Sequence, residues 1–142
     1  FIGQPFAIRR SPQVDAQFSV AYCVAAAIWH RQLALAQFRV EAILDRGVRN
    51  LATKVTAVID AARPDLVSMH LVDGRIVSES ITQPLGHPER PLSQDAIASK
   101  LRDCCEHAAI QSGDSQVDKL LALLNGFSSV GNASELLKAT CS

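Results

Sequence analysis

The sequence is poor in aromatic residues and carries no net charge. Aromatic residues make up 5% of its 142 residues, and 14 basic side chains balance 14 acidic ones. A protein that binds nucleic acid needs a basic face, and binding to single strands also uses aromatic rings on which the bases stack. We therefore expect no nucleic-acid partner.

Apolar runs long enough to cross a membrane are missing as well. The stretch from Val20 to Trp29 is apolar throughout, but a membrane-spanning helix needs roughly 20 such residues. The first residues, 1–6, lack the basic start and the long apolar core of a signal peptide. We expect no membrane contact and a cytoplasmic location. Because the chain starts at Phe1 rather than at Met, we also expect a fragment of a longer protein.

Motifs for metals, phosphates and nucleophilic catalysis are absent too. The cysteines at 23, 104, 105 and 141 have neither CxxC nor zinc-finger spacing. The glycines form no phosphate-binding loop, and no serine has recognisable triad partners. We expect reduced thiols and no zinc site.

What the sequence does have is an alanine-rich apolar stretch after Asp15. Alanine is the strongest helix former, so the stretch predicts a helix near 16–33. A helix that is apolar on all sides is buried on all sides, and we expect this one in the core. Its first turn is polar and carries Gln17, Ser19 and Tyr22.

The middle of the chain changes from a helical period to alternation. Over 54–62, apolar residues at 55, 57, 59 and 61 alternate with Lys54, Thr56, Val58 and Asp60, a pattern that predicts a strand. Asp73 and Gly74 lie between two runs rich in β-forming residues, which indicates a hairpin over 66–82 with a type I′ turn. These segments predict a small antiparallel sheet.

Helices are predicted before and after these strands along the chain. Asp45 and Ser93 are typical N-caps, and apolar residues recur at helical spacing after each of them. They recur again in a later segment, where we expect four buried positions: Val117, Leu120, Leu121 and Leu124. An order of helices, strands and helices predicts an α+β fold with the sheet packed against helices. We expect one domain over residues 1–142.

Tyr22 is the strongest candidate for a functional side chain. It could be a core tyrosine whose hydroxyl bonds a backbone group, or it could donate to a substrate carboxylate or act as an acid or base. Ser19 lies three residues earlier, on the same helix face. Gln17 and Ser19 could equally be ordinary residues of a first turn. We expect the four histidines and the pair Arg9-Arg10 at or near the surface, although His87 could contact a ligand and Arg9-Arg10 could meet an anionic substrate.

Four segments, in this order, carry a family resemblance. Residues 16–25 read AQFSVAYCVA, and 45–55 follow the pattern D..V..L..KV. The predicted hairpin comes next, and 86–93 read GHPERPLS. Together they resemble the MmgE/PrpD family, which includes 2-methylcitrate dehydratase, cis-aconitate decarboxylase and iminodisuccinate epimerase.

The resemblance implies an architecture and a chemistry. Family members have an N-terminal helical domain and a smaller C-terminal lid domain, with the active site between them. They take a proton from a carbon next to a carboxylate of a small di- or tricarboxylate. They then lose water or carbon dioxide, or invert a centre, generally without a metal or organic cofactor. The chain resembles the lid portion, and the helical domain and the family's Lys-x-Tyr-Pro…His motif are not in this sequence.

The resemblance also implies site residues and a function. Tyr22 matches the tyrosine of the family segment and is the candidate catalytic residue, with Gln17 and Ser19 as candidate substrate-binding residues. The hypothesis is the substrate-covering lid of a lyase similar to 2-methylcitrate dehydratase, inactive as an isolated fragment and a homodimer in its full-length form. An isomerase or decarboxylase on the same scaffold, and a non-catalytic oligomerisation or binding module, stay open as alternatives.

Overall fold

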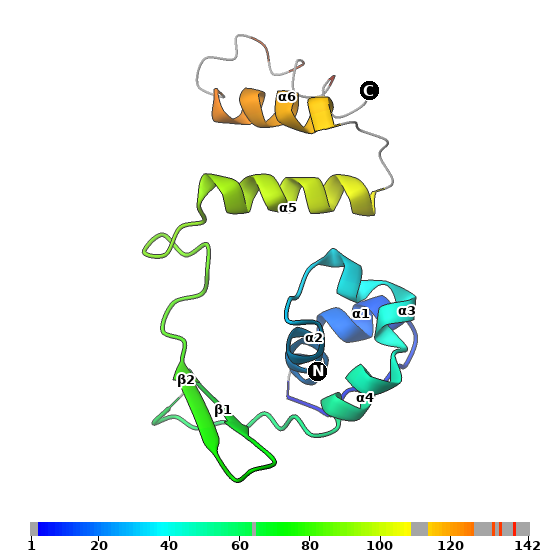
Figure 1. Ribbon diagram of the computed structural model, residues 1–142, viewed down its shortest axis with the longest axis vertical. Coiled ribbons are helices and arrows are strands. Elements are labelled where there is room, and N and C mark those ends of the chain that lie inside the picture. The colour runs from blue at the N-terminus through cyan, green and yellow to red at the C-terminus, as the bar shows by residue number, and fades with distance from the viewer. Residues whose placement is uncertain are drawn as a thin grey trace. The chain divides into compact units, whose positions relative to one another are not determined.

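The computed structural model describes residues 3–63, 65–108 and 114–126, together with 132, 134 and 138. Contacts divide the chain into two compact units, residues 1–92 and 93–142. Helices α1 to α4 and a hairpin belong to the first unit, and α5 and α6 belong to the second (Figure 1). Helices combined with a two-stranded antiparallel sheet confirm the α+β class. That the two units form one domain stays a prediction.

The first helical segment is split in two rather than continuous. Helix α1 spans Pro12–Gln17 and α2 spans Val20–His30, so the single helix predicted near 16–33 is wrong in its bounds. Ser19 adopts an extended conformation between them, and its hydroxyl accepts a hydrogen bond from the backbone N–H of Tyr22. A serine in this position is a strong N-cap, so it starts a new helix instead of continuing the old one.

Helix α2 is buried on one side, not on all sides as predicted. Ala21, Tyr22, Ala25 and Ala26 are its buried residues. Trp29, near the other end, is 54% exposed, and Val20 and Ile28 are exposed as well. The buried side consists mostly of alanine, which lets neighbouring helices approach closely. Figure 1 shows α1 to α4 gathered around one another.

The remaining elements of this helical cluster are short. A 3-10 turn, η1, spans Leu35–Phe38, α3 spans Val40–Ile43 and α4 spans Arg46–Ala52. Asp45 caps α4 as predicted, because its carboxylate accepts a hydrogen bond from the N–H of Val48. These helices enclose a small core, whose buried members are Ala16, Tyr22, Ala25, Ala26, Ile43, Val48 and Ala52.

Gly47 allows the close approach of α2 and α4. A Cβ at this position would lie 2.2 Å from Cζ2 of Trp29, because the indole ring covers the glycine. No side chain larger than hydrogen fits without moving the ring.

Replacing Gly47 by Ala is therefore expected to displace the Trp29 ring into water. Overpacking costs about 1–3 kcal/mol, and alanine's better helix propensity offsets about 1 kcal/mol of it. We expect a net loss of about 1 kcal/mol in unfolding free energy and a red shift of the tryptophan emission. Trp29 is the single tryptophan, so emission reports on this contact alone. Arg49→Ala, on the exposed side of α4, is the matched control, and an unchanged spectrum in Gly47→Ala would contradict the account.

The predicted hairpin is present, with a different turn. Strand β1 spans Leu66–His70 and pairs antiparallel with β2, Ile76–Ser80. Gly74 has a φ of 85°, whereas Asp73 has no positive φ, so the turn is not type I′. The N–H of Gly74 donates to the carbonyl of Leu71, and the N–H of Leu71 donates to the carbonyl of Arg75. This is a type I turn followed by a glycine bulge.

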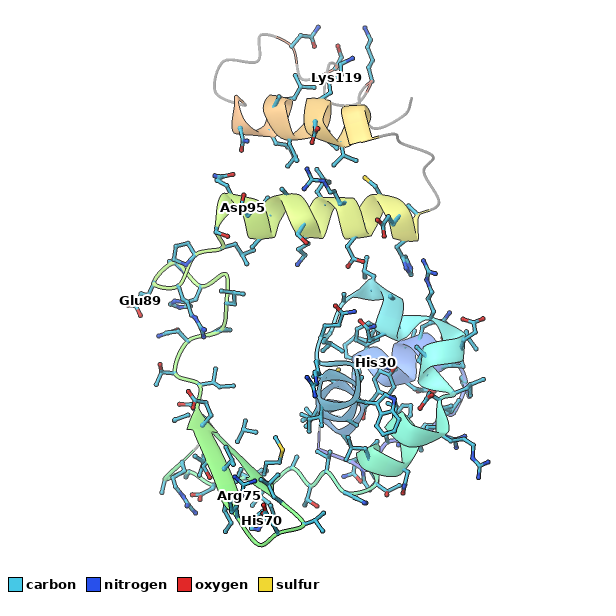
Figure 2. All side chains as sticks on the ribbon, in the orientation of Figure 1. His30, His70, Arg75, Glu89, Asp95 and Lys119 are labelled. Carbon is cyan, nitrogen blue, oxygen red and sulfur yellow. The ribbon has the colours of Figure 1, made fainter. Side chains whose placement is uncertain are left out.

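A salt bridge closes the turn. The carboxylate of Asp73 accepts hydrogen bonds from the backbone N–H of Arg75 and from its Nε, the latter at 2.7 Å. These two hydrogen bonds, the backbone one first, hold the pKa of Asp73 below its usual range. Figure 2 shows Arg75 and His70 on the hairpin.

The strand predicted over 54–62 is not formed. These residues have no helix or strand assignment, and Ile59 is fully exposed. Alternation alone makes no strand, because the backbone groups also need a neighbouring strand to bond. All residues of β1 and β2 are exposed, so the expected packing of the sheet against helices is not seen in the described residues.

The second unit is a pair of helices. Helix α5 spans Gln94–His107 and α6 spans Asp114–Asn125, and Figure 1 shows them side by side and running in opposite directions. Ser93 caps α5 as predicted, accepting a hydrogen bond from the N–H of Ala96. An ion pair at 3.0 Å joins Arg102 to Asp118. Val117 and Leu120 are buried as predicted, but Leu124, predicted to be buried with them, is 45% exposed.

Candidate functional site

Tyr22 lies at the centre of the helical cluster. Its side chain is completely buried, and its ring contacts those of Phe6 and Phe38 at centroid distances of 5.0 and 5.8 Å. The hydroxyl donates to the backbone carbonyl of Gln37 in η1. The hydroxyl therefore already has a hydrogen-bond acceptor inside the protein. This geometry agrees with the interpretation of Tyr22 as a core tyrosine whose hydroxyl bonds a backbone group. A role in catalysis stays a prediction.

Of the two candidate substrate-binding residues, Ser19 contacts Tyr22, whereas Gln17 does not point into the core. Ser19 is buried, and its Oγ lies 3.2 Å from the Tyr22 nitrogen. Gln17 is the last residue of α1 and is exposed. Ser19 thus acts as a helix cap, and Gln17 is the one candidate of the three whose side chain reaches solvent.

A small crevice borders Ser19. It has a volume of about 10 Å³, and Arg9, Asp15 and Phe18 are among its lining residues. This is room for a single water molecule. Asp15 accepts hydrogen bonds from the backbone N–H groups of Arg9 and Arg10, which fixes the extended segment before α1. The crevice is too small for a polycarboxylate.

Burial changes the acidity of two groups in this region. Burial, followed by the nearby Cys23 and the negative charge of Asp45, raises the pKa of Tyr22 above its ordinary value of 10.0. Burial also raises the pKa of the Cys23 thiol above 9.0. Both groups are held in their neutral forms, so Tyr22 can donate a proton in a hydrogen bond but is a poor base at neutral pH.

The alkaline titration of Tyr22 tests this environment. The folded state holds the proton more tightly than the unfolded state, so this group leaves stability unchanged below pH 10 and lowers it as the pH rises further. Because Tyr22 is the single tyrosine, tyrosinate absorbance reports on it alone. We expect a midpoint above 10.0 in the native chain, whereas the chain unfolded in urea is the control and titrates at the ordinary value. A native midpoint at or below the control would contradict a buried hydroxyl.

A larger groove lies beside α4. It has a volume of about 310 Å³ and is lined by Phe6, Arg46, Arg49, Asn50 and Thr53. Small-molecule sites are typically about 300–1,000 Å³, so the groove is at the lower end of that range. Phe6 is shared between this groove and the packing around Tyr22. Sequence reasoning missed Arg46 and Arg49, although their spacing of three residues in a predicted helix places them on one face.

Histidines and thiols gather into no metal site in the part of the chain that is described. No group of three or more His, Cys, Asp or Glu side chains is close enough there to hold a metal ion. Cys23, Cys104 and Cys105 are free thiols, and Cys141 lies outside the described residues. His30, labelled in Figure 2, ends α2 with its Nε2 buried and without a hydrogen-bond partner among the described residues. Among the helices that are described, none has both the length and the apolar character to span a membrane.

Comparison with protein families decides the relationship. The model of the MmgE/PrpD C-terminal domain matches residues 2–124. The chain belongs to this family. The match confirms the family and the C-terminal portion expected from the four motifs, and it covers α1 to α5 and most of α6 of this MmgE/PrpD chain. No curated protein matches the chain.

Proposed function

We propose that this MmgE/PrpD chain forms the substrate-covering lid of a lyase that acts on small di- or tricarboxylates, in the manner of 2-methylcitrate dehydratase. Proton abstraction next to a carboxylate starts the reaction, and groups of a helical domain supply the acid and base. The lid contributes enclosure and positive charge. A homodimer, in a cytoplasmic setting and without a cofactor, belongs to the same proposal.

The family match over residues 2–124 carries this proposal. The structure adds one supporting feature. Two arginines that form no ion pair with a described residue line a groove large enough for a small anion, and a guanidinium binds a carboxylate through charge-assisted hydrogen bonds. Neither an acid–base pair nor a pocket that encloses a substrate is formed by the described residues. A lid without the helical domain cannot hold a substrate against the acid and base groups, so the chain alone is expected to be inactive.

The experiment compares the chain alone with the chain joined to a helical domain of the family. Both are incubated with 2-methylcitrate, citrate and cis-aconitate, and the products are identified by chromatography. We expect no turnover by the chain alone and turnover of at least one substrate by the joined protein. Turnover by the chain alone would contradict a lid, and no turnover by a folded joined protein would contradict the lyase. Epimerised or decarboxylated product would instead support the alternative reactions on the same scaffold.

Replacing Tyr22 by Phe tests its predicted role in the site. If the hydroxyl bonds substrate, turnover in the joined protein falls at least tenfold, which corresponds to about 1.4 kcal/mol of barrier. The same change leaves the Gln37 carbonyl without its donor, at a cost of about 1–3 kcal/mol in stability. Turnover is therefore compared well below the melting temperature, with circular dichroism as the check on folding. Unchanged turnover together with reduced stability would return Tyr22 to a packing role.

The hairpin favours a second candidate, a non-catalytic oligomerisation module. Residues opposite each other in the register share a face, which puts Val67, Met69 and Val77 together on one side. All three are exposed, at 40 to 52%. A two-stranded hairpin is marginally stable without further packing, so this mainly apolar face, which also carries Glu79 opposite Val67, favours association. Sedimentation of the chain distinguishes this module from the lyase lid. Dimers that form with increasing concentration and are abolished by Met69→Lys would support the module, provided that the joined protein shows no turnover.

A further inference from the structure

The exposed side of α4 is a stripe of polar groups with two positive charges. Arg46, Arg49, Asn50 and Thr53 follow the spacing i, i+3, i+4 and i+7, which places them on one helix face. The opposite side of the helix packs on the core through Val48 and Ala52, both essentially buried. The core contact therefore holds the stripe in place along the groove.

The two arginines have no acidic partner among the residues that the structure describes. Arg63, Arg75 and Arg102 each form an ion pair with an aspartate, but neither Arg46 nor Arg49 forms one with any described residue. Asp45 precedes Arg46, yet its carboxylate accepts the hydrogen bond that caps the helix. Like charges three residues apart on a helix repel each other, and an anion between them removes this repulsion. The groove thus presents positive charge that no described acidic side chain neutralises through an ion pair.

We propose that this groove binds a small polycarboxylate through Arg46 and Arg49. A planar guanidinium matches a carboxylate with two parallel hydrogen bonds, and two arginines can hold two carboxylates of one molecule. The side-chain amide of Asn50 supplies a further donor. The hydroxyl of Thr53 already donates to the carbonyl of Asn50 at 2.8 Å, so Thr53 only borders the groove.

The half-buried ring of Phe6 connects the groove to the core. Phe6 lines the groove and packs on Tyr22 at a centroid distance of 5.0 Å. A bound anion with an apolar carbon chain can lie over this ring while its carboxylates meet the arginines. The choice of a carboxylate over a phosphate rests on the proposed function, since an arginine pair alone suits both anions.

Calorimetric titration of the 142-residue chain with citrate, and separately with inorganic phosphate, tests the proposal. We expect citrate to bind, phosphate to bind more weakly, and the double variant Arg46→Gln/Arg49→Gln to weaken citrate binding at least about tenfold. The matched control is Arg31→Gln/Arg39→Gln, which removes two exposed arginines outside the groove and should change affinity less than about twofold. Equal weakening by both double variants, no binding of citrate, or tighter binding of phosphate would overturn the proposal.

Two further readouts keep the test valid if the double variant does not fold. Arg49→Lys keeps the charge but loses the planar fork, and we expect about threefold weaker citrate binding. In nuclear magnetic resonance spectra, citrate should shift the side-chain amide signals of Asn50, and unmoved signals at saturation would overturn the groove as the site.

The two proposals fail in distinguishable ways. Citrate bound in the groove by a joined protein without turnover would refute the proposed function alone. Turnover combined with citrate binding that ignores Arg46 and Arg49 would refute the groove alone.

Discussion

Replacing Tyr22 by Ala is expected to remove about 3–5 kcal/mol of unfolding free energy, the usual cost of truncating a large buried aromatic side chain. The variant loses the ring contacts with Phe6 and Phe38 and leaves the Gln37 carbonyl without its donor. The total unfolding free energy of a small domain is only about 5–15 kcal/mol, so the helical cluster would be close to unfolding. Urea denaturation followed by Trp29 fluorescence measures the change.

Phe18 is the matched control for this substitution. It is also aromatic and close in sequence, but it is 58% exposed. We expect Phe18→Ala to cost less than about 1 kcal/mol, because substitutions at exposed positions away from specific contacts have small effects. Similar losses in the two variants would show that Tyr22 is not the centre of the core.

The second large effect is expected at Ile43, the last residue of α3. Its side chain is completely buried in the cluster that contains Tyr22 and Val48. Ile43→Ala removes buried methyl groups and leaves a cavity, which costs about 2–5 kcal/mol. The denaturation midpoint in urea and its slope should show the loss, with the slope unchanged.

Leu44, the next residue along the chain, is the control for Ile43. It is 47% exposed and contributes no buried side chain to the core. Leu44→Ala should lower the unfolding free energy by less than about 1 kcal/mol. A larger loss at Leu44 than at Ile43 would mean that the opposite face of α3 is packed.

Sequence reasoning succeeded where the determining contact is local. Asp45 and Ser93 each cap a helix by accepting from an N–H three residues later, so the motif contains both partners. The hairpin is similar, because its turn lies within a few residues of Asp73 and Gly74. The family motifs pointed to the C-terminal domain that the match over 2–124 shows.

It failed where the outcome depends on distant partners. The alternation over 54–62 resembles a strand, but no neighbouring strand in the described residues pairs with it. The apolar run in α2 could not reveal that Trp29 would be half exposed over Gly47. The acceptor for the Tyr22 hydroxyl belongs to Gln37, fifteen residues away, and no local pattern points to it.

The candidate site shows both cases. The sequence contains the signal for the capping role of Ser19, because this serine directly precedes the apolar run of α2. The prediction of one continuous helix over this region placed Ser19 inside a helix and so missed the cap. The stripe of Arg46 and Arg49 was also readable from its helical spacing. Its exposure and its lack of an acidic partner depend on the packing of α4, which the spacing alone does not determine.

Isotope exchange in heavy water tests the central claim most directly, because the proposed dehydration starts with proton abstraction next to a carboxylate. The chain joined to a helical domain of the family is incubated with 2-methylcitrate and citrate in D₂O and followed by nuclear magnetic resonance. We expect the joined protein to form product or to incorporate deuterium at the carbon next to a carboxylate, and the chain alone to do neither. A folded joined protein that produces neither product nor exchange would contradict a lyase lid.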